Sequence, residues 1–159
     1  MKYLILAILL VVAVLLYAGP QLLHVAPASK SAAQMSGTSL DLSHQSLSKL
    51  PRDVVSQRAL ERLDISSNDL RGALPAEIRH LGNLKVLIAS NNRMTGVPAE
   101  IGQLSKLEVL DLSNNEITGL PHEIANLKNL KVLNVSGNHP SRHDLDIIQK
   151  ALPGLQVLE

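Results

Sequence analysis

The chain has 159 residues, about the length of one average domain, so a catalytic domain beside a second module is excluded. Lys and Arg number 15 against 14 Asp and Glu, and this balance offers no basic surface for nucleic acid. The absence of cysteine excludes a disulfide framework and a thiolate metal site.

The first element is an apolar segment. Residues 3–19 carry no charged side chain, and continued to residue 25 the segment is long enough to cross a bilayer as a helix. We therefore expect residues 1–25 to form a single-pass membrane anchor, with residues 3–25 in the membrane. The alternative is a removable secretory signal, because Ala26-Pro27-Ala28 has the small-x-small pattern of a cleavage site.

The orientation of this segment follows from the basic residues that flank it. The amino terminus and Lys2 outweigh Lys30, which favours an amino terminus inside the cell and residues 40–159 outside the cytoplasm. Residues 26–39 are small and polar and are expected to form a flexible tether.

Four similar segments follow the tether. LERLDISSNDL, LKVLIASNNRM, LEVLDLSNNEI and LKVLNVSGNHP begin at residues 60, 84, 107 and 130, and a degenerate copy precedes them. Apolar residues alternate with polar ones at the start of each copy, which predicts a short strand with one buried face. One asparagine recurs after each strand, where a buried amide can bond the backbone of the turn, so we expect a structural ladder of Asn68, Asn92, Asn115 and Asn138.

The second half of three copies reads LPAEIRHL, VPAEIGQL or LPHEIANL. The proline of each suits the first position of a short helical turn, and the isoleucine and last leucine are expected to point into the core. Since no single copy can bury its apolar side alone, the copies must stack into a curved solenoid. A helix at about 144–152, ended by Pro153-Gly154, is expected to cap the stack before a sixth strand at 155–158.

These motifs resemble the leucine-rich repeat family over about residues 37–159. The copies are similar to the 23-residue LPxxIxxLxxL type, while LRGALPAEIRHLGN at 70–83 has one more residue and resembles the LxGxLP form of plant receptors. The resemblance implies an α/β fold: a right-handed solenoid with a parallel concave sheet of five to six short strands, here preceded by the transmembrane helix. The lack of cysteine-rich caps favours a bacterial envelope protein over an animal matrix protein.

The resemblance also implies that the concave strand face binds a protein or peptide. Its outward positions predict an apolar patch with a polar rim, made by Arg62, Asp64, Val86, Ile88, Val109, Asp111, Val132 and Asn134. The competing interpretation is that these residues are ordinary strand formers and family filler, because the patch lacks aromatic anchors.

No catalytic or cofactor site is predicted. His139, His143, Asp144 and Asp146 are potential metal ligands, but Pro140 interrupts them and the sequence shows no third neutral ligand. No Ser-His-Asp arrangement stands out, so we expect a non-catalytic, membrane-tethered binding module without cofactors. The alternatives are a cytoplasm-facing scaffold that engages a signalling protein and an envelope-structural protein without a specific ligand.

Overall fold

The computed structural model describes residues 38–159. The expected anchor at 1–25 and the tether up to residue 37 lie outside the described residues. Within those residues, no helix combines the length and apolar character that a membrane crossing requires. The solenoid begins slightly before the expected boundary, because the Thr38 carbonyl already accepts the amides of Glu61 and Arg62 at 2.6 and 3.0 Å.

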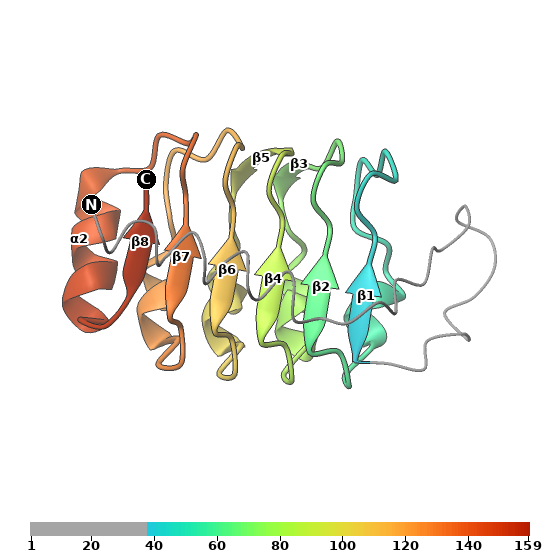
Figure 1. Ribbon diagram of the computed structural model, residues 1–159, viewed down its shortest axis with the longest axis horizontal. Coiled ribbons are helices and arrows are strands. Elements are labelled where there is room, and N and C mark those ends of the chain that lie inside the picture. Colours follow the sequence, from blue (N-terminus) through green and yellow to red (C-terminus); the bar gives the residue numbers. More distant parts are fainter. Residues whose placement is uncertain (1–37) are drawn as a thin grey trace, which may run out of the picture.

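Six three-residue strands form one parallel sheet, and they lie side by side in chain order (Figure 1). They are β1 (Ser39–Asp41), β2 (Arg62–Asp64), β4 (Val86–Ile88), β6 (Val109–Asp111), β7 (Val132–Asn134) and β8 (Gln156–Leu158). Every neighbouring pair is in register without a shift. The predicted parallel sheet of five to six strands is therefore confirmed.

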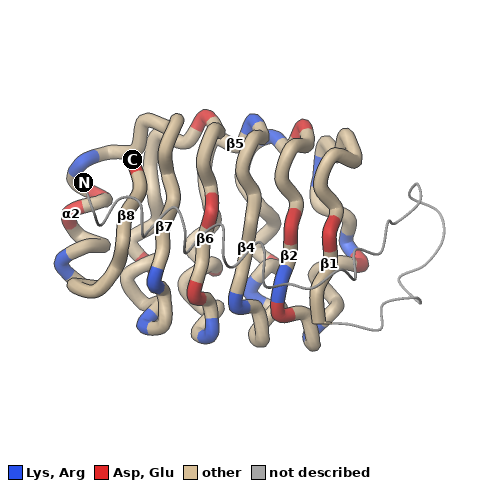
Figure 2. Tube along the Cα trace, viewed as in Figure 1, with Lys and Arg blue, Asp and Glu red and all other residues tan. Residues whose placement is uncertain are grey.

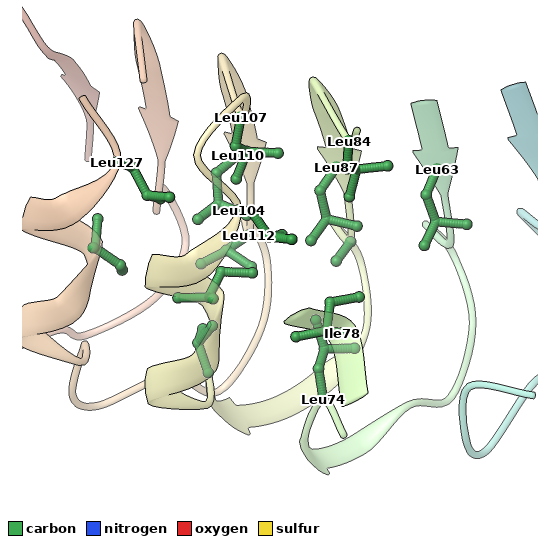
Figure 3. Close-up of a cluster of buried hydrophobic side chains, with 14 of the residues drawn as sticks. Leu63, Leu74, Ile78, Leu84, Leu87, Leu104, Leu107, Leu110, Leu112 and Leu127 are labelled. Carbon is green, nitrogen blue, oxygen red and sulfur yellow. The ribbon is translucent and has the colours of Figure 1, made fainter. Parts of the chain in front are cut away.

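The core lies between this sheet and a row of short 3-10 helices behind it. These helices are η2 (Val54–Ser56), η3 (Ala76–His80), η4 (Ala99–Gln103) and η5 (His122–Asn126). The middle residue of each strand points inward, and Leu63, Leu87 and Leu110 are fully buried. They meet the isoleucines of the helical turns in one continuous cluster (Figure 3). Burying one leucine or isoleucine side chain of this cluster stabilises the fold by about 1.5–3 kcal/mol compared with leaving it exposed to water.

The prolines lie one residue earlier than predicted. Pro75, Pro98 and Pro121 precede η3, η4 and η5, with φ of −66°, −72° and −67° and an extended ψ. The fixed φ of proline suits this position as well, since the residue before a helical turn keeps a non-helical ψ. The Pro75 carbonyl then accepts the amide of Ile78 at 3.0 Å and closes the turn.

Gly102 lets two consecutive helical turns approach closely. A Cβ at this position of η4 would overlap the backbone carbonyl and the Cβ of Glu123 in η5. The backbone of η5 belongs to the next repeat and cannot move without disturbing the stack. Only glycine fits there, whereas a Cβ at Gly82 would meet nothing within 4 Å.

A second sheet, which the sequence analysis did not predict, lies on the edge of the solenoid. Strands β3 (Arg71–Ala73) and β5 (Arg93–Gly96) pair in parallel, with a register shift between Gly72 and Ala73. This shift falls in the repeat that has the additional residue. Gly72 accommodates that residue with a φ of +71°, a conformation that favours glycine.

The carboxyl-terminal cap consists of α2 (Arg142–Ala151) and β8. The helix begins two residues before the expected position 144 and ends one before 152, because the chain is still extended at Ser141, with ψ of 130°, and turns helical directly after it. Leu145 and Ile148 are buried, and α2 packs against η5 at the end of the stack (Figure 1). This helix covers the apolar side that the last repeat would otherwise expose.

Candidate protein-binding face

The solvent side of the six-stranded sheet, here called the sheet face, carries two columns of side chains. The first residue of each strand forms one column and the third residue the other, because successive strand residues point to opposite sides. The register places Arg62, Val86, Val109 and Val132 side by side in the first column, and Asp64, Ile88, Asp111 and Asn134 in the second. The structure thus brings all eight predicted face residues onto adjacent strands.

Three aliphatic side chains occupy the middle of the sheet face. Val86, Ile88 and Val109 are half-buried, and we call them the aliphatic strip. Val86 stands in register with Val109, while Ile88 stands between Asp64 and Asp111. Figure 2 shows acidic residues on β1, β2 and β6 but none on β4, where Ile88 interrupts the run of aspartates in the second column.

Val132 was expected to form part of the exposed patch, but its side chain is buried. It is only 6% exposed, although it does not belong to the main hydrophobic cluster. Val109 and Gln156 lie in register on its two sides, and side chains on neighbouring strands stand about 4.8 Å apart and cover one another. The accessible apolar surface is therefore smaller than predicted and is centred on β4 and β6.

The polar residues of the second column bond within their own repeats. One carboxylate oxygen of Asp64 accepts both the amide and the hydroxyl of Ser66, at 3.0 and 2.7 Å. Asp111 does the same with Ser113, and the side-chain oxygen of Asn134 does the same with Ser136. Alternation along the strands does not predict this role, in which a side chain holds the turn by bonding the amide two residues later.

Asp111 keeps bonding capacity for a partner, whereas the unpaired donor of Arg62 is enclosed by the protein. In the described part of the chain, no residue bonds the Oδ2 atom of Asp111, since both bonds from Ser113 reach Oδ1. Arg62 contacts Asp64 at 3.4 Å, and its Nη1 atom is buried without a hydrogen-bond partner among residues 38–159. A buried donor left unpaired costs about 1–3 kcal/mol. Because the protein encloses this atom, a partner on the sheet face reaches it only if the Arg62 side chain moves.

The four asparagines of the predicted ladder join neighbouring repeats. The Nδ2 atom of Asn92 donates to the carbonyls of Ala89 and Ser90 in its own repeat and to Ile65 in the preceding one, at 3.0–3.1 Å. Its Oδ1 atom accepts the amide of Leu70 at 3.0 Å. The same arrangement recurs at Asn68, Asn115 and Asn138. These bonds fix the turn that follows each strand of the sheet face.

The residue before each ladder position has a left-handed backbone. Ser67, Asn91 and Asn114 have φ of 53° to 54°, and Gly137 occupies the same position with 71°. In the first repeat His44, which precedes Gln45 at the equivalent position, has a φ of 56°. This conformation turns the chain sharply out of the strand, and asparagine and glycine adopt it most readily. The sequence signal for this left-handed residue is the recurrence of Asn or Gly just before the ladder asparagine. The apolar columns that predicted the strands do not contain this signal.

A column of alternating charge borders the sheet face. Glu61 pairs with Lys85 at 3.0 Å and Glu108 with Lys131 at 2.5 Å, each across two adjacent repeats (Figure 2). Backbone bonds from Lys85 to Glu61, from Glu108 to Lys85 and from Lys131 to Glu108 keep the four residues in line. Exposed pairs of this kind contribute little energy, but they leave the border without net charge.

Asp144, one of the four residues considered as metal ligands, bonds within the carboxyl-terminal part of the stack instead. Asp144 accepts the amide of Leu120 at 3.0 Å and contacts the Nε2 atom of His122 at 3.2 Å. The Leu120 amide holds the pKa of Asp144 below its ordinary value of 3.8; burial opposes this, and the contact with His122 adds to it. Residues 38–159 contain no group of three or more His, Asp or Glu side chains arranged to hold a metal ion.

The comparisons with known proteins identify the family. The model of the leucine-rich repeat family matches residues 38–94 and 83–139, which together exceed half of the chain. The protein therefore belongs to the leucine-rich repeat family. No curated protein sequence matches it.

Several solved structures are similar to this chain. The leucine-rich repeat protein LIC12759 of Leptospira interrogans is 42% identical with a TM-score of 0.70, over 74% of this chain and 30% of that one. The ectodomain of the receptor kinase SOBIR1 of Arabidopsis thaliana is 29% identical with a TM-score of 0.60, over 75% and 65%. The ectodomain of GASSHO1/SCHENGEN3 from the same plant, in complex with CASPARIAN STRIP INTEGRITY FACTOR 2, is 34% identical with a TM-score of 0.54, over 58% and 11%. The chain thus spans less than a third of the Leptospira protein it matches.

Proposed function

We propose that this protein is a non-catalytic module that binds a protein or peptide through the sheet face. The observation that supports the proposal most directly is the aliphatic strip of Val86, Ile88 and Val109. It lies beside the Oδ2 atom of Asp111, which accepts no hydrogen bond from residues 38–159. An apolar centre with a polar rim is the usual composition of a protein interface. A partner would place apolar side chains on the strip and a hydrogen-bond donor at Asp111.

Rigid display is the mechanism that this proposal implies. Strand pairing fixes the backbone on both sides of β4 and β6, and the asparagine ladder fixes the turns that follow. Binding would therefore order few residues of this protein, and the associated loss of conformational entropy would be small. The plant ectodomain solved with a bound factor supports a peptide or protein as the ligand class.

A site-specific photocrosslinker tests which side of the solenoid meets the partner. Placed at Val109 in the native cell, it is expected to capture a defined protein. The matched control is the same group at Gln103, which is exposed in η4 on the opposite side of the core. Equal capture of the same protein from both positions would argue against the sheet face.

The captured partner then allows a quantitative test. Val109→Glu places a charge in the aliphatic strip and is expected to weaken binding of the purified partner at least about tenfold, or about 1.4 kcal/mol. Gln103→Glu adds the same charge on the other side and is expected to leave binding unchanged. Circular dichroism should show the same fold for both variants. A partner that binds Val109→Glu as tightly as the wild type would refute the proposed surface.

The proposal includes a membrane tether. Residues 1–25 would anchor the protein in a bacterial envelope, with residues 40–159 outside the cytoplasm. The similarity to the ectodomain of a receptor kinase supports a domain outside the cytoplasm. A carboxyl-terminal alkaline phosphatase fusion is expected to be active, since that enzyme folds in an oxidising compartment. An inactive fusion would favour the cytoplasm-facing scaffold, and a mature amino terminus near residue 29 would favour secretion after cleavage.

A further inference from the structure

A groove lies on the side of the solenoid away from the sheet face. Its volume is about 610 Å³, and it separates the segment 48–52 of the first repeat from β3 and η3 of the second. The floor is apolar, because Leu50, Val55, Leu70 and Leu74 are buried beneath it. Pockets of about 300–1,000 Å³ are typical of ligand sites.

The groove opens where the repeats differ in length. The second repeat has one more residue than its neighbours between Leu70 and Leu74, and it places this residue in the bulge at Gly72. The first repeat forms no strand at 48–50, so among residues 38–159 β3 pairs only with β5. As a result, β3 presents a free edge to the groove.

The main chain of Arg71 is available on that edge. The carbonyl of Leu70 faces β5, where it accepts the amide of Arg93 at 2.9 Å. Alternation along the strand therefore directs the amide and carbonyl of Arg71 away from β5 and toward the groove. Apart from the β3–β5 pairing itself, residues 38–159 give neither group a backbone hydrogen bond. An unpaired edge of this kind is a template for a further strand.

The rim of the groove is positively charged. Lys49, Arg52 and Arg71 line it together with a single carboxylate, Glu77. Arg71 pairs with Asp69 at 2.9 Å, whereas Lys49 and Arg52 form no ion pair within the described residues. Two exposed cations thus stand free at the side of the groove that faces β3.

The geometry points to a second binding site: the groove accepts an extended acidic peptide segment of another protein, which adds as a parallel or antiparallel strand to the edge of β3. The Arg71 amide and carbonyl bond the peptide backbone, alternate apolar side chains enter the floor, and acidic side chains reach Lys49 and Arg52. This site is separate from the sheet face and does not depend on the proposed function of that face.

Selection from a random library of phage-displayed heptapeptides, on the full-length chain in detergent, tests this site. Peptides enriched in Asp and Glu are expected to bind, and to bind at least about tenfold more weakly to the double variant Lys49→Glu/Arg52→Glu. Both side chains are exposed, so this variant should keep the wild-type circular dichroism spectrum. The matched control is Val109→Glu, which alters the sheet face and should not affect these peptides.

Hydrogen exchange distinguishes strand addition from simple charge attraction. A selected peptide is expected to slow exchange of the Arg71 amide. N-methylation of every second peptide residue should abolish binding when the methylated amides face β3 and should leave binding intact when they face away from it. Selected peptides without acidic enrichment, peptides insensitive to the charge reversal, or an Arg71 amide that exchanges at an unchanged rate would each overturn the inference. Peptides lost only in Val109→Glu would instead support the sheet face.

Discussion

The substitution Asn115→Leu isolates the contribution of one amide of the ladder. The Nδ2 atom of Asn115 donates to the carbonyls of Ala89, Leu112 and Ser113, and its Oδ1 atom accepts the amide of Met94 at 3.0 Å. After the substitution the three carbonyls keep a second donor each, from the side chains of Asn92 and Asn138 and the amide of Asn91. The Met94 amide alone loses its partner, in a residue that is 1% exposed.

The expected cost follows from that single amide. A buried donor without a partner costs about 1–3 kcal/mol. Leucine has as many side-chain heavy atoms as asparagine and larger terminal groups, so no cavity adds to this cost. For a domain of this size the loss corresponds to a decrease of roughly 4–12 °C in melting temperature. Urea unfolding followed by far-ultraviolet circular dichroism measures the free energy, because residues 38–159 contain neither Trp nor Tyr.

The control is Asn126→Leu, an exposed asparagine of η5 whose side chain has no bond within the described residues. Its free energy of unfolding should change by less than about 0.5 kcal/mol. Amide exchange supplies a local readout, since the Met94 amide should exchange faster in Asn115→Leu. If both variants matched the wild type in stability, or if the Met94 amide kept its protection, the reasoning about the orphaned donor would be wrong.

Three further predictions concern the frame of the solenoid. Gly102→Ala should lower the free energy of unfolding by about 1–3 kcal/mol in urea titrations, because the methyl group overlaps the backbone of η5, whereas Gly82→Ala should change it by less than about 0.5 kcal/mol. Ser67→Gly should raise it by about 0.5–1 kcal/mol, since glycine adopts a φ of 54° without strain; an unchanged or lower value would contradict this. Asp144→Ala should destabilise the protein at pH 7 and progressively less as the pH falls below 3.8. The folded-state pKa of Asp144 is depressed, so its contribution is present above 3.8 and lost in acid; parallel stability–pH curves for wild type and variant would exclude the role.

The repeat pattern predicted the sheet because apolar columns report burial directly. The spacing of Leu63, Leu87, Leu110 and Leu133 predicted the register of β2, β4, β6 and β7. The LxxL pattern at 155–158 predicted the last strand, β8. The second sheet was not predicted because the pairing of Arg71 with Arg93 depends on where the additional residue of the second repeat bulges. Two repeats of unequal length can be paired in several registers, and the sequence does not indicate which one forms.

The face residues were located by the sequence, but their bonding was not. Alternation is sufficient to place Asp64 and Asp111 on the solvent side. Their bonds to serines depend on the turn conformation after each strand, which no alternation pattern contains. The burial of Val132 likewise depends on which side chain the capping strand places beside it, and this became visible only with Gln156 in register.

The charged border of Glu61, Lys85, Glu108 and Lys131 repeats every second coil, whereas the hydrophobic spine repeats every coil. Duplicating one coil of 23 residues would preserve the spine but would set two ammonium groups or two carboxylates beside each other. Duplicating two consecutive coils would keep opposite signs adjacent throughout. An extended version of this protein is therefore easiest to build in steps of two.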